Sequence, residues 1–219
     1  MMTNDEHHAN DMHRPLVLID FDGVINQFPD DKVRRRQNST AWMKPEDPRA
    51  AVYAAGNWFV PDRKERVDTG RRGRWTITWS SELMEHLKSL DVEILWLSTW
   101  QPYTELLNAH LGVDWKTVTW YDPVTGANRL IGKRRAVLDH LREGRPLVWI
   151  DDEETTYDAG LAIQSNEPSA PVLGVGPDSS IGISRPQMEM IERFVADPPN
   201  ETMVCFDVRN GTHEGHWGF

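Results

Sequence analysis

Short apolar runs that alternate with helix-like segments constrain the fold of this chain more than any other feature of its sequence. The run Leu16-Val17-Leu18-Ile19 contains no polar residue, as in a strand that is buried on both faces of a sheet. Similar runs occur at residues 92–97, 117–120 and 147–150, and a weaker one occurs at 172–175. Strands that alternate with helices of about ten residues are typical of a parallel sheet with helices on both faces. We therefore expect an α/β, Rossmann-like sandwich.

The segments between these runs carry apolar residues at helical spacing. Helices are predicted at residues 81–90, 103–111 and 133–141, each with leucines on one face. A fourth helix is predicted to start at Ser184-Arg185-Pro186-Gln187, which is a capping-box pattern with proline in the first turn. Residues 203–208 are predicted as one more strand.

Residues 25–79 interrupt the alternation. This stretch is rich in Pro, Arg and Asp and has no sustained period. Within it, Trp58-Phe59-Val60 and residues 75–79 resemble strands, and the turn between them contains Gly70 and Gly73. A β-hairpin is therefore predicted, as part of an enlarged flap or small cap inserted after the first strand.

The length of 219 residues fits one domain with an insertion. We expect a mobile tail (1–14), a catalytic domain (15–200) that includes the insert (25–79), and a C-terminal extension (201–219). The single cysteine, Cys205, excludes an internal disulfide framework and a cysteine-ligated zinc site. No apolar run approaches the ~20 residues that span a bilayer, and the N-terminus has no secretory pattern, so a cytoplasmic protein without membrane contact is expected.

Charge is distributed unevenly along the chain. The net charge is −10, yet residues 25–80 hold 12 of the 24 Lys and Arg residues and only 7 of the 34 acidic ones. A basic insert therefore accompanies an acidic body. Its charges keep a solvated loop soluble, or they face an anionic substrate. Its tryptophans either form a small core or stack on the bases of a nucleotide or single strand; they are Trp42, Trp58, Trp75 and Trp79.

Polar side chains follow the predicted strands at the edge where ligands bind in open α/β sheets. Asp20-Phe21-Asp22-Gly23 follows the first strand, Ser98-Thr99 the second, and Asp151-Asp152-Glu153-Glu154 the fourth, while Lys133 opens the third helix. Crowded carboxylates repel one another unless a cation compensates their charge. Because all the ligands on offer are hard oxygens, the set favours Mg²⁺.

Each of these residues also has a structural interpretation. Asp20 and Asp22 would lie in a solvated turn, and Ser98 would be an ordinary strand-end hydroxyl with Thr99 as its rival. Lys133, which precedes two arginines, would belong to a solvated basic turn. Glu153 and Glu154 are expected to favour the positive N-terminal end of the next helix rather than to bind metal.

In sequence order, Ile19-Asp20-Phe21-Asp22-Gly23-Val24, Leu97-Ser98-Thr99, Lys133 and Trp149-Ile150-Asp151-Asp152 resemble the four motifs of the haloacid dehalogenase (HAD) superfamily. The resemblance covers residues 16–196 without the insert. The segments Leu95 to Trp100 and Gly176 to Ser184 are similar to HAD domains associated with RNA-repair proteins.

The resemblance implies a role for each motif residue. Asp20 would attack phosphorus and form an aspartyl-phosphate, and Asp22 would protonate the leaving oxygen and then activate water. Ser98 would hydrogen-bond a phosphoryl oxygen, and Lys133 would neutralise developing charge. Mg²⁺ would be held by Asp20, the Asp22 carbonyl and the pair Asp151 and Asp152. Of this pair, we expect Asp152 to contact the metal and Asp151 to orient Lys133.

The predicted function is Mg²⁺-dependent hydrolysis of phosphomonoesters, since Asp at the second motif position is the family's phosphatase pattern. The predicted substrate is a nucleotide or a nucleic-acid 3′-phosphate end. Substrate contacts are expected from Thr99, Trp100, Arg71, Arg72 and Arg74. Two alternatives remain open at this point: a non-catalytic module that binds nucleic acid or a partner, and a phosphatase of small metabolites. The oligomeric state is not predicted.

Overall fold

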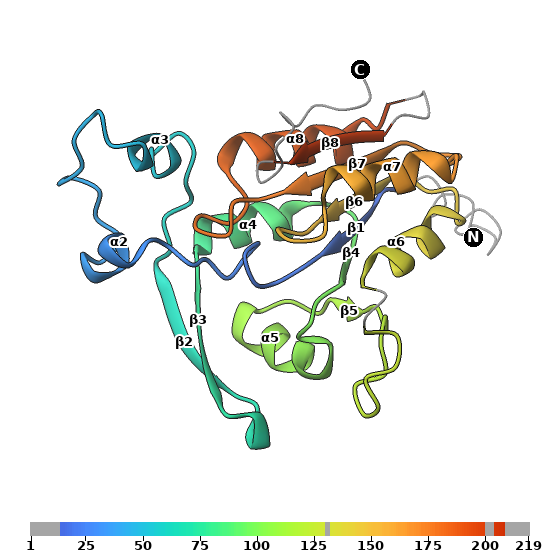
Figure 1. Cartoon of the computed structure of the whole chain (residues 1–219), viewed down its shortest axis with the longest axis horizontal. Helices are drawn as coiled ribbons and strands as arrows, with labels where there is room; N and C mark the ends of the chain where they lie inside the picture. The colour runs from blue at the N-terminus through green and yellow to red at the C-terminus, as the bar shows by residue number, and fades with distance from the viewer. Residues whose placement is uncertain (1–13, 130–131, 200–203, 209–219) are drawn as a thin grey trace, which may run out of the picture.

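A computed structural model describes residues 14–129, 132–199 and 204–208 of the chain. Its main sheet has six parallel strands in the order β5-β4-β1-β6-β7-β8 (Figure 1). Their bounds are β1 Leu16–Ile19, β4 Glu93–Trp96, β5 Lys116–Thr117, β6 Leu147–Ile150, β7 Val172–Gly176 and β8 Val204–Val208. The parallel α/β sheet confirms the predicted fold class. Residues 1–13 and most of the predicted C-terminal extension lie outside the described residues.

Helices cover both faces of the sheet. Apolar side chains of α4 (Ser81–Ser89), α5 (Thr104–Leu111) and α8 (Arg185–Ala196) share one core with Val17 and Ile19 of β1. Those of α6 (Arg134–Leu141) and α7 (Tyr157–Ser165) share the other core with Leu16 and Leu18. Successive residues of β1 therefore enter opposite cores, which explains its uninterrupted apolar run. Among the described helices, none is long and apolar enough to cross a membrane.

Two predicted elements are confirmed in detail and one is shorter than expected. The capping box at the start of α8 is present, with Ser184 and Gln187 each bonded to the other's backbone. The strand predicted at 203–208 is β8. The run at 117–120 contributes only its first residue to β5 (Lys116–Thr117), because the chain turns into a loop after Thr117.

The register of the central strands aligns their carboxyl ends. Ile19 lies opposite both Trp96 and Ile150, and Ile150 lies opposite Val175. The pairing continues one residue further, where the Asp20 amide donates to the Ile150 carbonyl at 2.9 Å. The residues that follow these strands are consequently brought to one edge of the sheet.

The insert contains α2 (Asp31–Arg35), α3 (Arg49–Val52) and a hairpin of β2 (Arg63–Asp68) and β3 (Arg74–Trp79), joined through the short helix η1 (Gly70–Arg72). The hairpin and its turn were predicted, but the first strand was misplaced at residues 58–60. That segment is apolar because Trp58 and Phe59 are buried, not because it is extended in a sheet. β2 carries mostly charged residues and buries only Val67, so its sequence has no strand signal.

The tryptophans of the insert divide between the two interpretations. Trp58 is 1% exposed and packs with Val33, Tyr53 and Ile181 in a small core of its own. Trp79 is also buried. Trp75, by contrast, is 53% exposed, although it lies on the same strand as Trp79. The core interpretation therefore accounts for Trp58 and Trp79, and for Trp42, which is half-buried against the same small core as Trp58. It does not account for Trp75.

Candidate functional site

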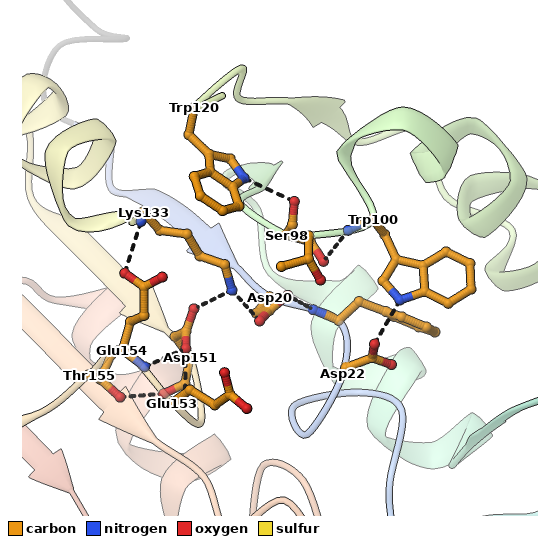
Figure 2. A network of polar contacts seen from close by, with 12 residues as sticks. Asp20, Asp22, Ser98, Trp100, Trp120, Lys133, Asp151, Glu153, Glu154 and Thr155 are labelled. Carbon is orange, nitrogen blue, oxygen red and sulfur yellow. Dashed lines mark hydrogen bonds and ion pairs between the residues drawn. The ribbon is translucent and has the colours of Figure 1, made fainter. Parts of the chain in front are cut away.

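Side chains from three segments meet at the carboxyl edge of the sheet. Asp20 follows β1, Asp151 follows β6, and Lys133 is the residue that precedes α6. The Lys133 ammonium donates to Asp151 Oδ2 at 2.7 Å and also to Asp20 Oδ2 (Figure 2). All three residues are buried, with Lys133 only 3% exposed. The solvated interpretations of the Asp20 turn and of Lys133 are therefore wrong.

Asp151 is fully engaged by its neighbours. Its Oδ1 accepts hydrogen bonds from the amides of Glu153 at 3.0 Å and Glu154 at 2.7 Å, while its Oδ2 accepts from Lys133. The Thr155 hydroxyl donates to the Asp151 carbonyl. These bonds hold the carboxylate in one orientation, so Asp151 positions the lysine.

Glu154 fixes the backbone of Lys133 and Arg134 at the start of α6. Its Oε2 accepts from the Lys133 amide at 2.8 Å and from the Arg134 amide at 3.3 Å, at the N-terminus of α6. A carboxylate is stabilising there because the first amides of a helix lack partners and carry partial positive charge. The sequence placed Glu153 and Glu154 at the next helix instead. That helix, α7, begins at Tyr157 and is capped by Thr156.

Asp22 points away from the lysine and toward the insert. Its Oδ2 accepts from Trp100 Nε1 at 2.8 Å and its Oδ1 from Asn26 Nδ2 at 2.6 Å. Asn26 is itself fixed, because its Oδ1 accepts from the Thr78 amide of β3 at 2.8 Å. Two donors therefore hold the half-buried Asp22 carboxylate in place. Asn26 carries no motif that would have identified it in the sequence.

The residues after β4 take different positions. Ser98 is completely buried, acts to lower the pKa of Asp20 from close by, and accepts a hydrogen bond from the Trp100 amide at 3.2 Å. Thr99, its rival in the sequence, is exposed. Trp100 packs edge-on against Phe21, with ring centroids 5.4 Å apart. Ser98 is thus the hydroxyl that lies beside Asp20, and Trp100 is the residue that links this loop to Asp22.

Three carboxylates form a cluster that could hold a metal ion. Oxygens of Asp20, Asp151 and Asp152 all lie within 4.8 Å of one another. Gly23 makes this approach possible, since its φ is +69° and a Cβ there would collide with the Asp152 carboxylate. The Asp22 carboxylate is not part of this cluster, and the metal ligand predicted at that residue, its backbone carbonyl, stays a prediction.

The cluster carries more negative charge than its lysine compensates. Burial, followed by the repulsion of Asp151, raises the pKa of Asp20 to about 7, although Lys133 and Ser98 act to lower it. Burial and the charges of Asp151 and Asp20 raise the pKa of Asp152 to about 7. Burial alone would lower the pKa of Lys133, but Asp20 and Asp151 raise it. An oxygen-only set with excess negative charge fits a hard divalent cation.

A cavity of about 290 Å³ opens beside Asp22. Its walls come from the hairpin, the loop after β4 and the loop before α6; they are Asp22, Thr69, Arg72, Trp75, Thr99, Trp100, Tyr103 and Arg129. The three arginines predicted to contact substrate therefore separate. Arg72 lines the cavity, Arg71 does not, and Arg74 pairs with Asp68 at 3.0 Å.

A larger cavity of about 590 Å³ lies against the outer face of the hairpin, beside Thr76 and Thr78. Of its basic residues, Arg34 and Arg63 pair with Asp31 and Asp62, while Lys64 forms no ion pair among the described residues. Neither cavity is lined by a carboxylate of the metal cluster, but the smaller one is lined by Asp22, two residues after Asp20, so the chemistry of the site is more closely tied to it.

Comparisons with protein-family models, curated proteins and solved structures gave no match to this chain.

Proposed function

We propose that the chain is a metal-dependent phosphomonoester hydrolase of the HAD type, acting through an aspartyl-phosphate on Asp20. The observation that carries the proposal is the pairing of two carboxylates with different surroundings. Asp20 is buried beside Lys133 and Ser98, and Asp22, two residues on, faces an open cavity. A pure binding module has no use for a buried carboxylate nucleophile with a second carboxylate so placed.

The residues divide the reaction into two steps. An Asp20 oxygen attacks phosphorus while the bond to the leaving oxygen breaks, and Asp22 gives that oxygen its proton. Asp22 then takes a proton from a water molecule that attacks the phosphorus of the acyl-phosphate, which releases inorganic phosphate and restores Asp20. Lys133 and Ser98 stabilise charge on the phosphoryl oxygens.

The residues that would hold a divalent cation are Asp20 and Asp152, and we propose Mg²⁺ because the ligands are carboxylates. When bound, it supplies positive charge next to the phosphoryl group. Asp151 already uses both oxygens, for Lys133 and for two amides, whereas Asp152 pairs with no lysine or arginine in the described part of the chain. Asp152 is therefore expected in direct contact with the metal, with Asp151 outside it.

Turnover of a generic aryl phosphate tests this function directly. The purified chain is expected to release phosphate in Mg²⁺, to lose this activity in EDTA, and to regain it when Mg²⁺ is restored in excess. Absence of turnover under all three conditions, with a folded protein, would contradict the proposed function.

Replacing Asp152 by asparagine is expected to stabilise the metal-free protein at pH 8. The Asp152 pKa of about 7 lies above its ordinary value of 3.8, so this group favours the folded state below about pH 4 and loses that contribution as pH rises through 7. Removing the charge should gain on the order of 1 kcal/mol after screening, or roughly 2–4 °C in Tm.

The same variant should also lose the rise in Tm that Mg²⁺ gives the wild type. Thermal melts at pH 8 and pH 5, with and without Mg²⁺, measure both effects. The gain should be smaller at pH 5, where the folded-state carboxyl is protonated, and should disappear only below about pH 4, where the unfolded-state carboxyl is protonated as well. Suppose instead that Asp152→Asn melts at a lower temperature than wild type at pH 8 and still gains stability from Mg²⁺. Asp152 would then be neither destabilised by its neighbouring carboxylates nor a ligand of the metal.

Replacing Trp100 by phenylalanine is expected to lower kcat without unfolding the protein. The variant keeps an aromatic ring against Phe21 but loses the N–H that donates to Asp22 at 2.8 Å. Hydrogen bonds to charged groups contribute about 1.5–3 kcal/mol, so kcat should fall about tenfold or more. Steady-state kinetics with the aryl phosphate and a thermal melt check this. An unchanged kcat would mean that Asp22 does not depend on this bond.

A further inference from the structure

We propose that the cavity beside Asp22 is a subsite for a nucleotide that carries a second phosphate besides the one removed. The inference rests on the proposed function, in which Asp22 protonates the leaving oxygen. Whatever lies in the cavity next to Asp22 is then the leaving group. The residues that line this cavity therefore select the substrate.

The cavity contains one exposed aromatic ring that no core contact explains. Trp75 is 53% exposed, yet its indole N–H donates to the Thr69 hydroxyl at 3.2 Å, so the ring is oriented. Trp100 and Tyr103, which belong to or pack against the main core, contribute ring edges to the same walls. Exposed, oriented aromatic rings are the surfaces on which nucleobases stack, since every base has a planar face.

Two guanidinium groups in the same walls have no acidic partner among the residues that the structure describes. Arg72 comes from the hairpin turn and Arg129 from the loop before α6, and neither forms an ion pair within residues 14–129, 132–199 and 204–208. Elsewhere in the insert, some arginines pair with acids, as Arg49 does with Asp47 at 2.6 Å and Arg74 with Asp68, while others, such as Arg66, form no ion pair among the described residues.

Aromatic rings support both guanidinium groups instead. Arg72 lies 5.9 Å from the Tyr103 ring centroid and Arg129 lies 5.7 Å from that of Tyr121. Among the described residues neither guanidinium donates a hydrogen bond, so its N–H groups remain for a phosphate. Arginines held in this way favour an anionic ligand beyond the phosphoryl group at Asp20.

The size of the cavity limits the ligand. A volume of about 290 Å³ is at the lower end for small-molecule sites, which fits one nucleotide inside the cavity. A sugar phosphate would leave the aromatic rings unused, and a polyphosphate would not stack on them. The shared chemistry is a base next to two phosphates, which occurs in a free nucleoside bisphosphate and at the phosphorylated end of a nucleic-acid strand.

Steady-state kinetics on four substrates test the inference: a nucleoside 3′,5′-bisphosphate, the matching 3′-monophosphate, glycerol phosphate and a 3′-phosphorylated oligonucleotide. The wild type should show the highest kcat/KM with the bisphosphate or the oligonucleotide. Trp75→Leu should lower kcat/KM about tenfold for substrates with a base and leave glycerol phosphate unchanged. Arg72→Gln and Arg129→Gln should each remove most of the advantage of the second phosphate.

Matched controls come from the same insert. Trp42→Leu removes a tryptophan outside the cavity, and Arg66→Gln removes an exposed arginine from β2; both should leave every substrate unchanged. If the natural substrate is the end of a nucleic-acid strand, the oligonucleotide should have a higher kcat/KM than the bisphosphate, and this advantage should shrink between about 50 and 200 mM salt. If the two kcat/KM values are equal, the natural substrate is a free nucleotide.

A binding measurement separates failure of the subsite from failure of the proposed function. Calorimetry with the nucleoside bisphosphate, in EDTA, should show binding to wild type and loss of at least about tenfold in affinity in Trp75→Leu and Arg72→Gln. Equal losses in the control variants, or equal effects on glycerol phosphate, would overturn the subsite. Binding without turnover of any phosphate ester would leave the subsite standing and reject the hydrolase.

Discussion

Replacing Asp20 by asparagine is expected to abolish phosphate release. The substitution keeps the shape of the side chain but removes the oxygen nucleophile, and loss of a nucleophile costs about 10⁴-fold or more in kcat. Lys133 keeps its bond to Asp151 at 2.7 Å, and the change removes one of three mutually repelling carboxylates. The fold is therefore expected to stay intact, as circular dichroism and a thermal melt would show.

Asp114→Asn is the control for this experiment, because it changes an exposed aspartate away from the cluster. It should keep full activity. Near-normal turnover in Asp20→Asn would show that another group attacks phosphorus and that the assigned mechanism is wrong.

Replacing Lys133 by methionine is expected to damage both stability and activity. Methionine fills much of the same volume, but Asp20 and Asp151 would then face each other as buried carboxylates without their ammonium partner. Breaking a buried ion pair on one side costs about 3–5 kcal/mol, which corresponds to roughly 10 °C in Tm for a chain of this size. Loss of its charge from the phosphoryl site should lower kcat at least about 100-fold.

A double variant separates the two losses. Lys133→Met combined with Asp151→Leu also removes the second buried charge, so part of the lost stability should return while activity stays low. Chemical denaturation and steady-state kinetics on both variants check this. If Lys133→Met alone is as stable as wild type, the ion pairs of Lys133 with Asp20 and Asp151 contribute little to the free energy of unfolding. If the double variant regains activity, Lys133 has no role in the reaction.

The parallel sheet and its acidic edge could be predicted because both depend on local patterns. A run such as Leu16–Ile19 is apolar throughout only when both faces of the strand are covered. Once the strands are placed, their carboxyl ends must meet, which brings Asp20 and Asp151 together, and Lys133 reaches them from the start of α6. No contact between distant residues had to be known in advance.

The parts that could not be predicted depend on contacts between distant segments. Glu154 serves a helix that precedes it in the chain by 20 residues or so, and Asn26 joins Asp22 to the hairpin. α7 contains Gly160 and follows a turn, and its sequence showed no helical pattern strong enough to be noticed. Arg71, Arg72 and Arg74 are equivalent in the sequence pattern, but they lie around a tight turn. Only Arg72 lines the cavity, and Arg74 pairs with Asp68.

Rapid acid quench of the Asp22→Asn variant, during turnover of a ³²P-labelled phosphate ester, tests the central claim most directly. The ester is an aryl phosphate whose leaving oxygen needs no proton, so the variant still forms the intermediate. It lacks the group that activates water, so the intermediate should accumulate. We expect a hydroxylamine-labile phosphate on the peptide that contains Asp20, and none when Asp20→Asn is added. Release of phosphate with no label on the protein, or with the label on another residue, would contradict the account.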